Sequence, residues 1–197
     1  MYHELLRDAS FWEFLFSVDE DLAETAGKRR CSCGGRLHRA NYLRKPRGGP
    51  RDLPKQCRLR FSYCCDQDGC RKRATPRSVR FLGRKVYLAA VVILVSAMQQ
   101  GPSRWRVEEL SRLFGADRRT ISRWQAFWRD HFPRTAFWKV ARARLVPAVE
   151  VIALPLSLLQ AFVCADDPND IQREGWKGLL IFLAPITITG GLAIKIS

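Results

Sequence analysis

Residues 63–73 read "YCCDQDGCRKR" and place three of the chain's seven cysteines just before a basic run. Asp68 and Gly69 supply a turn, and Cys70 leads directly into the bases. A second cysteine group, "CSCGG" at residues 31–35, also lies beside glycines, which permit a tight backbone turn. The sequence therefore predicts two short cysteine-bearing turns that meet in the fold.

Two such turns are typical of a structural zinc site, in which four Cys or His ligands surround the metal as a tetrahedron. Residues 58–65 alternate as a half-buried strand, and the alternation puts Cys65 rather than Cys64 on the face of Phe61 and Tyr63. The predicted zinc ligands are Cys31, Cys33, Cys65 and Cys70, with Cys64 as the alternate.

Three further residues bear on this assignment. His38 and Cys57 are substitutes for one of the ligands; otherwise His38 is a surface side chain and Cys57 a small buried one. Cys164 stands alone in an apolar segment and is expected in the core. A redox pair beside a βαβ pattern is not present, and no histidine is placed to activate a catalytic cysteine.

The first residues are acidic and lack the charged and apolar regions of a secretory signal. We therefore expect a cytoplasmic, nucleoid-associated protein, in whose reducing surroundings clustered cysteines bind metal more often than they form disulfides.

Charge is concentrated in the middle of the chain. The formal net charge is +15 and the sequence pI is about 10.2. Residues 1–27 hold seven acids and one base, whereas residues 28–85 hold nineteen bases and three acids. A field of this size and sign favours a polyanionic partner, and a surface that merely mixes both charges is the weaker interpretation.

A second pattern occupies residues 106–128, "RVEELSRLFGADRRTISRWQAFW". Gly115 lies where a left-handed residue would end a first short helix, and Asp117 is placed to cap the next helix. Ile121, Trp124 and Trp128 recur at helical spacing and give the second helix an apolar face. This arrangement predicts a helix-turn-helix, and the apolar run at residues 85–98 predicts the third helix of a homeodomain-like core.

The other face of the second helix is basic, as a recognition helix in the major groove requires. The predicted DNA-binding residues are Arg118, Arg119, Ser122, Arg123 and Arg129, together with Arg71, Lys72 and Arg73 as phosphate contacts. The alternatives are an ordinary amphipathic helix pair with a solvated basic face, or aromatic stacking on single strands. The aromatic spacing favours packing over stacking.

The predicted fold is mainly α with a small β zinc ribbon. We divide it into an acidic amphipathic helical segment (1–27), a basic zinc-ribbon-like module (28–82), a three-helix helix-turn-helix domain (83–133) and a helical apolar C-terminal region (134–197). The apolar runs are short or interrupted by Pro and Gly, so no membrane span is expected.

Residues 30–130 resemble the zinc-ribbon plus helix-turn-helix proteins, and the N-terminal halves of transposases, that bacterial transposons and insertion sequences encode. The resemblance rests on the two cysteine turns, on "CRKRATPRSVRFLGRKVY" and on "TISRW", although the first turn is one residue shorter than usual. It implies zinc on the predicted cysteines and duplex DNA on the predicted arginines. A transposase, a recombinase or a second copy of the chain is the further partner it implies.

The acids after residue 128 lie mostly in or near one loop and do not suggest the three carboxylates that hold two catalytic metal ions. We therefore expect a sequence-specific, non-catalytic DNA-binding protein of a mobile element. Two alternatives stay open: a transcriptional regulator on the same scaffold, and a transposase or nuclease whose active site is not recognised.

Overall fold

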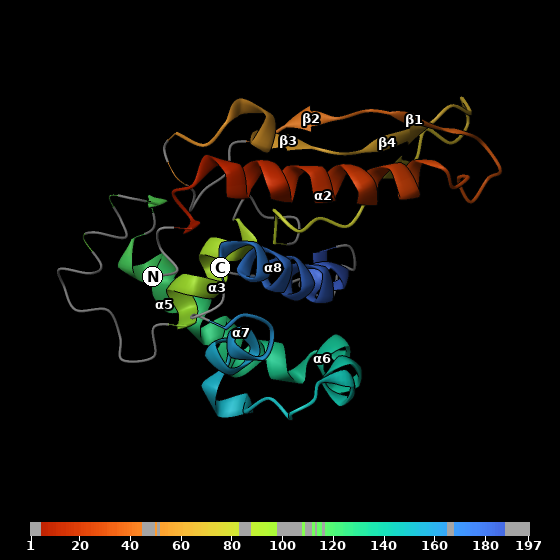
Figure 1. The fold of residues 1–197 in the computed structure, drawn as a ribbon. Coiled ribbons are helices and arrows are strands. Elements are labelled where there is room, and N and C mark those ends of the chain that lie inside the picture. Colours follow the sequence, from red (N-terminus) through yellow and green to blue (C-terminus); the bar gives the residue numbers. More distant parts are fainter. Residues whose placement is uncertain are drawn as a thin grey trace.

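A computed structural model describes residues 5–44, 50, 52–82, 88–97, 108, 112, 114, 115, 117–164 and 168–187. The chain is mainly helical with a small antiparallel sheet, as the sequence predicted in outline. Figure 1 shows the elements stacked in layers: the strands, then the long helix α2, then α3 and α8, and finally α7 and α6.

Helix α2 (Ala9–Gly27) is the predicted N-terminal helix, and it lies between two layers. The Asp8 side chain caps it by accepting a hydrogen bond from the Ser10 amide at 2.9 Å. Trp12 and Leu15 are buried against the helical layers, and Ala23 is buried against the strands. The predicted acidic segment is thus an integral part of the fold.

The strands are short and antiparallel. β1 (Leu37–Arg39), β4 (Tyr63–Cys65) and β5 (Arg73–Ala74) form one sheet in the order β1-β4-β5, and β2 (Tyr42–Leu43) pairs with β3 (Leu59–Arg60). Tyr63 lies opposite Arg39 on β1 and Ala74 on β5. Its ring faces α2, where its hydroxyl donates a hydrogen bond to the Ala23 carbonyl at 2.6 Å.

The half-buried strand predicted over residues 58–65 differs from the structure in two ways. It is divided between β3 and β4, and Arg60 and Ser62 are buried along with the apolar residues. Arg60 Nη2 donates to the Pro76 carbonyl at 2.6 Å, and the guanidinium lies over the Phe81 ring. Burial lowers the pKa of the Arg60 guanidinium.

A buried ion pair joins α2 to the segment that follows β5. Arg80 Nε donates to Asp19 Oδ2 at 2.7 Å, and neither side chain is exposed. Asp19 also accepts from Ser78 Oγ and from the Val79 amide, both at 2.6 Å. The Arg80 guanidinium lies over the rings of Phe16, Phe61 and Phe81. Such a charge pair is retained in an interior only when it is fully hydrogen-bonded in this way.

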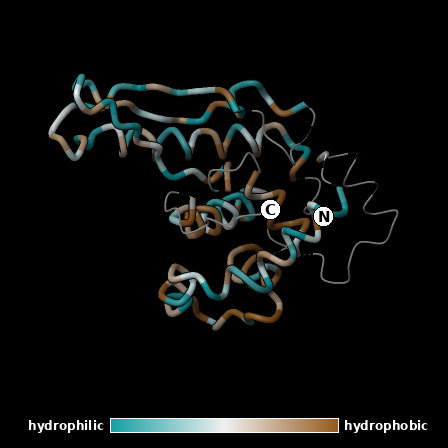
Figure 2. The backbone as a smooth tube through the Cα atoms, turned by 180° about the vertical axis from the view of Figure 1, so that it is seen from behind, coloured by the Kyte–Doolittle hydropathy of each residue, from teal (hydrophilic) through white to brown (hydrophobic). Residues whose placement is uncertain are grey.

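The remaining helices enclose the main core. They are α3 (Ala89–Ala97), α5 (Arg118–Ala126) with a π-helical continuation (Phe127–His131), α6 (Ala136–Ala141), α7 (Leu156–Phe162) and α8 (Asn169–Leu183). Figure 2 colours much of this part hydrophobic, while the strands alternate in character. The apolar run at 85–98 is helical wherever it is described beyond Leu88. No helix in the described part of the chain has the length and apolar character to cross a bilayer.

Candidate metal centre and nucleic-acid interface

The first cysteine turn follows α2 directly. The Cys31 amide donates to the Gly35 carbonyl at 2.9 Å, and the Gly34 amide donates to the Cys31 carbonyl at 2.8 Å. Gly34 has a φ of 88°, a left-handed conformation that glycine adopts without steric cost. A Cβ on Gly35 would lie 2.6 Å from Cys65 Sγ, so only glycine lets the two cysteine turns approach this closely.

The second turn connects β4 to β5. The Cys65 amide donates to the Lys72 carbonyl at 3.0 Å, and the amides of Cys70 and Arg71 both donate to the Gln67 carbonyl. Arg71 has a φ of 43°, which is uncommon outside glycine and turns the chain back toward the sheet. This turn brings Cys65 and Cys70 to the same side.

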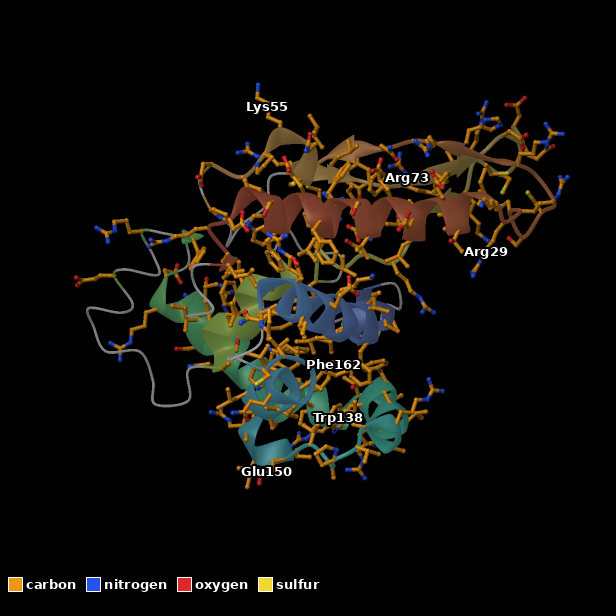
Figure 3. The ribbon with its side chains drawn as sticks, viewed as in Figure 1. Arg29, Lys55, Arg73, Trp138, Glu150 and Phe162 are labelled. Carbon is orange, nitrogen blue, oxygen red and sulfur yellow. The ribbon has the colours of Figure 1, made fainter. Side chains whose placement is uncertain are left out.

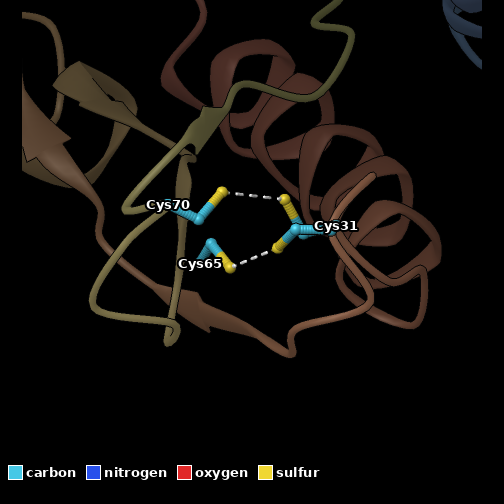
Figure 4. Close-up of side chains that lie close together, drawn as sticks. Cys31, Cys65 and Cys70 are labelled. Atoms are coloured by element: carbon cyan, nitrogen blue, oxygen red, sulfur yellow. Dashed lines mark hydrogen bonds between the residues drawn. The ribbon is translucent and has the colours of Figure 1, made fainter.

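Four thiols meet between the turns (Figure 4). The sulfur atoms of Cys31, Cys33, Cys65 and Cys70 all lie within 4.8 Å of one another. Cys33 Sγ lies 3.4 Å from Cys65 Sγ, and Cys31 Sγ lies 3.7 Å from Cys70 Sγ. Zinc–sulfur bonds of about 2.3 Å in a tetrahedron would place sulfurs about 3.8 Å apart. The four cysteines named from the sequence are therefore gathered at a spacing that can hold a metal ion.

The other candidate ligands do not join this group. Cys64 Sγ donates to the Arg71 carbonyl at 3.4 Å, and buried Cys57 donates to the Trp12 carbonyl at 3.4 Å. His38 Nε2 lies 3.6 Å from Asp66 Oδ2 on the surface. Cys164 is exposed, contrary to the expectation that it lies in the core, because the chain leaves α7 after buried Val163.

The thiols differ in acidity because their surroundings differ. The Cys33 amide, followed by the neighbouring thiols, lowers the pKa of Cys31 to about 6. The Gln67 amide favours the Cys65 thiolate, but burial and the adjoining thiols outweigh it and raise the pKa of Cys65 to about 12. A bound cation would offset the mutual repulsion of four thiolates, since the thiolate is the form that binds metal.

Several exposed cations surround the four cysteines. Arg71 pairs with Asp68 at 2.6 Å, Lys72 Nζ lies 3.5 Å from Ser32 Oγ, and the Arg73 guanidinium lies over the Tyr42 ring at 5.4 Å. The predicted phosphate contacts are thus exposed and beside the cysteine turns. Lys28, Arg29, Arg30 and Arg36 are exposed at the same end.

Helix α5 has the local structure that the sequence predicted. Gly115 has a φ of 64°, and Asp117 caps the helix by accepting from the Thr120 amide at 2.6 Å. The Thr120 amide lowers the pKa of the Asp117 carboxyl. Ile121, Trp124 and Trp128 are buried. The capped helix therefore turns its apolar face into the core.

The predicted DNA-contacting face of α5 is exposed to solvent. Its members are Arg118, Arg119, Ser122 and Arg123. Arg129 is exposed as well, but two of its guanidinium nitrogens, Nε and Nη2, donate to Asp130 at 2.9 Å. The preceding helix lies largely outside the described residues: Glu108, Arg112 and Phe114 are helical, and Phe114 is buried.

The two candidate DNA-contacting regions lie toward opposite ends of the molecule. Figure 3 places Arg29 and Arg73 at the end of α2 where the cysteine turns lie, whereas α5 lies toward the other end (Figure 1). The cysteine turns and α5 therefore lie apart in the structure. Tyr42 and Arg44, in "RANYLRK", were not singled out from the sequence; in the structure the guanidinium groups of Arg44 and Arg73 both lie over the Tyr42 ring.

No protein-family model matches the chain, and neither a curated protein nor a solved structure matches it.

Proposed function

We propose that this chain is a zinc-stabilised, sequence-specific DNA-binding protein that acts in the transposition of a mobile element, without a catalytic step of its own. The observation that carries the proposal is the exposed arginine face of α5 on a capped helix whose opposite face is buried. Arginine at the start of such a helix can pair with two acceptors of guanine in the major groove.

The four cysteines support zinc as the metal. Four thiolates in tetrahedral array suit zinc or an iron site, and zinc in such a closed site is structural. The short strands and two cysteine turns would then form a zinc ribbon, because metal binding supplies folding energy that a small module lacks. The basic surroundings of the turns favour a polyanionic partner.

The role in transposition rests on the resemblance of residues 30–130 to DNA-binding proteins of transposons. The described helices α3 and α5 contact each other as a helix-turn-helix core requires. The proposal therefore specifies a DNA site, such as an element end, that α5 reads.

Selection of bound duplexes from a random DNA pool tests the DNA-binding part. We expect one enriched motif, and Arg119→Ala should weaken binding to that motif by about tenfold or more, since a good arginine–guanine pair contributes about 1–3 kcal/mol. As a control, Arg142→Ala removes a positive charge from another exposed position, within residues 142–144, and should leave the preference for the DNA motif unchanged. A pool without enrichment, or equal losses in both variants, would contradict the assignment.

Elemental analysis of the purified chain tests the metal. We expect about one zinc per chain and no iron. Cys65→Ser should lose the zinc, whereas Cys64→Ser, one residue away and outside the cluster, should keep it. Iron in place of zinc, or zinc retained by Cys65→Ser, would refute a four-cysteine zinc site.

A further inference from the structure

The two faces of the sheet have different surroundings. The face toward α2 is apolar: Phe61 and Tyr63 are buried there with Ala23, and Phe16 packs on Phe61 at a centroid distance of 5.5 Å. Side chains alternate along a strand, so Cys64 and the residues opposite it lie on the other face. Ser62 and Arg60 are buried, whereas His38 and Arg73 are exposed and Cys64 is half-buried. We call the part of this second side that carries His38, Cys64 and Arg73 the outer face of the sheet; in Figure 1 no labelled element lies over it.

The outer face carries a row of polar side chains across the strands. His38 lies opposite Cys64, and Cys64 lies opposite Arg73. Tyr42, on the adjoining strand pair, meets this row because the Arg73 guanidinium lies 5.4 Å from the centre of its ring. Arg44 lies over the same ring at 5.6 Å and donates from Nη2 to Tyr42 Oη at 3.2 Å.

We propose that this outer face, through Arg44 and Arg73 held on Tyr42, binds the phosphate backbone of duplex DNA as a second contact surface distinct from α5. The proposal rests on the proposed function and extends it, because it adds Arg44 and Tyr42 to the phosphate contact predicted for Arg73 and assigns that contact to one face of the sheet. The sheet would position the protein on the duplex, and α5 would read its sequence.

Two guanidinium groups on one ring suit a phosphate. Each has a planar fork of N–H donors that matches phosphate oxygens, and stacking on Tyr42 fixes both forks before binding. Less side-chain entropy is then lost when a phosphate is bound.

The same stacking argues for a duplex over a single strand. Proteins bind single strands by stacking bases on open aromatic faces. The Tyr42 ring already has two cations over it, so the surface offers N–H donors to the backbone in place of an open ring.

The nearby acids on the cysteine turns have other partners. Asp66 lies 3.6 Å from His38, and Asp68 pairs with Arg71 at 2.6 Å. Among the described residues, no carboxylate forms an ion pair with Arg73. The charge of Arg73 therefore suits a phosphate.

Salt dependence of DNA binding by the zinc-loaded full chain is the decisive measurement. Against one duplex carrying the selected motif, Arg44→Ala with Arg73→Ala should reduce the slope of log K against log salt by about 2, or about 0.9 for each phosphate that is no longer neutralised. Affinity should fall by the same factor on a random duplex, because backbone contacts carry no sequence information. Arg142→Ala with Arg144→Ala removes equal charge from exposed positions and should leave the slope unchanged.

The outcomes of this experiment distinguish the outer-face contact from DNA binding by the chain as a whole. No DNA binding by the wild-type chain would refute the proposed function itself. Binding with an unchanged slope in the Arg44 and Arg73 variant would refute the outer-face contact alone, and so would an equal change in the control pair. Preference for a single-stranded oligonucleotide would also overturn the duplex assignment. Zinc content and circular dichroism of each variant establish that the fold is retained.

Discussion

The cysteine-bearing part of the chain (residues 28–82, the cysteine module) and the helical part around α5 (residues 117–141, the α5 region) are stabilised in different ways. In the cysteine module the strands are two or three residues long, and its small cluster buries Phe61 and Tyr63 against Ala23 of α2. In the α5 region large aromatic side chains pack on one another. Trp128 lies 4.7 Å from Phe132, and Phe132 lies 5.0 Å from Trp138, between ring centroids.

Two regions of one chain can thus depend on different kinds of stabilising interaction. The α5 region buries three large aromatic rings in the main core, which it shares with α2, α3, α7 and α8, and large rings dominate core energetics. In the cysteine module Phe61 and Tyr63 are buried between the strands and α2, while Leu53, Cys57, Val79 and Phe81 join the main core. The cysteine turns themselves are held by four thiols and a network of backbone hydrogen bonds. Removing one kind of interaction at a time should therefore affect one unit much more than the other.

The largest expected effect is metal removal. Chelation should unfold the cysteine turns and β1, β4 and β5, because apparent binding energies of structural zinc are about 10–16 kcal/mol and are folding energy for small modules. Hydrogen exchange followed by mass spectrometry should show loss of protection in residues 31–74, while residues 118–141 stay protected. Equal loss in both regions would show that the two units fold as one.

A smaller loss should follow disruption of the buried ion pair that ties the module to α2. Asp19→Ala leaves the Arg80 charge unpaired in the interior and removes the acceptor of the Val79 amide. Breaking such a buried pair costs about 3–5 kcal/mol. Urea unfolding should measure this loss, and Glu20→Ala, its exposed neighbour, should change stability by less than about 0.5 kcal/mol.

A double variant measures the interaction energy between Asp19 and Arg80. Arg80→Met with Asp19→Ala removes both charges, so the double variant should be more stable than the sum of the single losses implies. Additive losses would mean that Asp19 and Arg80 stabilise the fold independently of each other, through their separate hydrogen bonds and the rings under Arg80.

The four clustered cysteines could be predicted from the sequence because the neighbouring glycines and the alternation of a strand both depend on local sequence. The alternation of residues 58–65 separated Cys65 from Cys64, and the structure puts Cys65 with the other three thiols. The same alternation was wrong for Arg60 and Ser62, because it assumes a single covered face. Arg60 is buried by the segment at Pro76 and Phe81, a contact between distant parts of the chain that a local period does not record.

The caps and core of α5 were likewise local enough to predict. Asp117 and Gly115 have the conformations that their sequence positions indicated. The separation of α5 from the cysteine turns was not predictable, because it depends on α2, whose 19 residues lie between the strands and the helical layers. No local pattern in residues 1–27 indicates that this acidic segment occupies that position.

The smallest expected effect concerns the Asp117 cap of helix α5. The Thr120 amide lowers the pKa of Asp117, so the charged carboxylate stabilises the folded state above the unfolded pKa of about 3.9. This stabilisation is complete above the unfolded pKa and is lost as pH falls below it, through the lowered pKa of the folded state. Asp117→Ala should therefore reduce amide protection in residues 118–124 at about pH 6, and the reduction should shrink as pH falls below about 4. Asp117→Asn keeps the cap without the charge, so its protection relative to Asp117→Ala should not depend on pH.

Both variants are compared with wild type at each pH, so proton-driven metal loss in the cysteine module is common to all three. A deficit in Asp117→Ala that stays constant as pH falls below about 4 would show that the carboxylate charge does not stabilise α5.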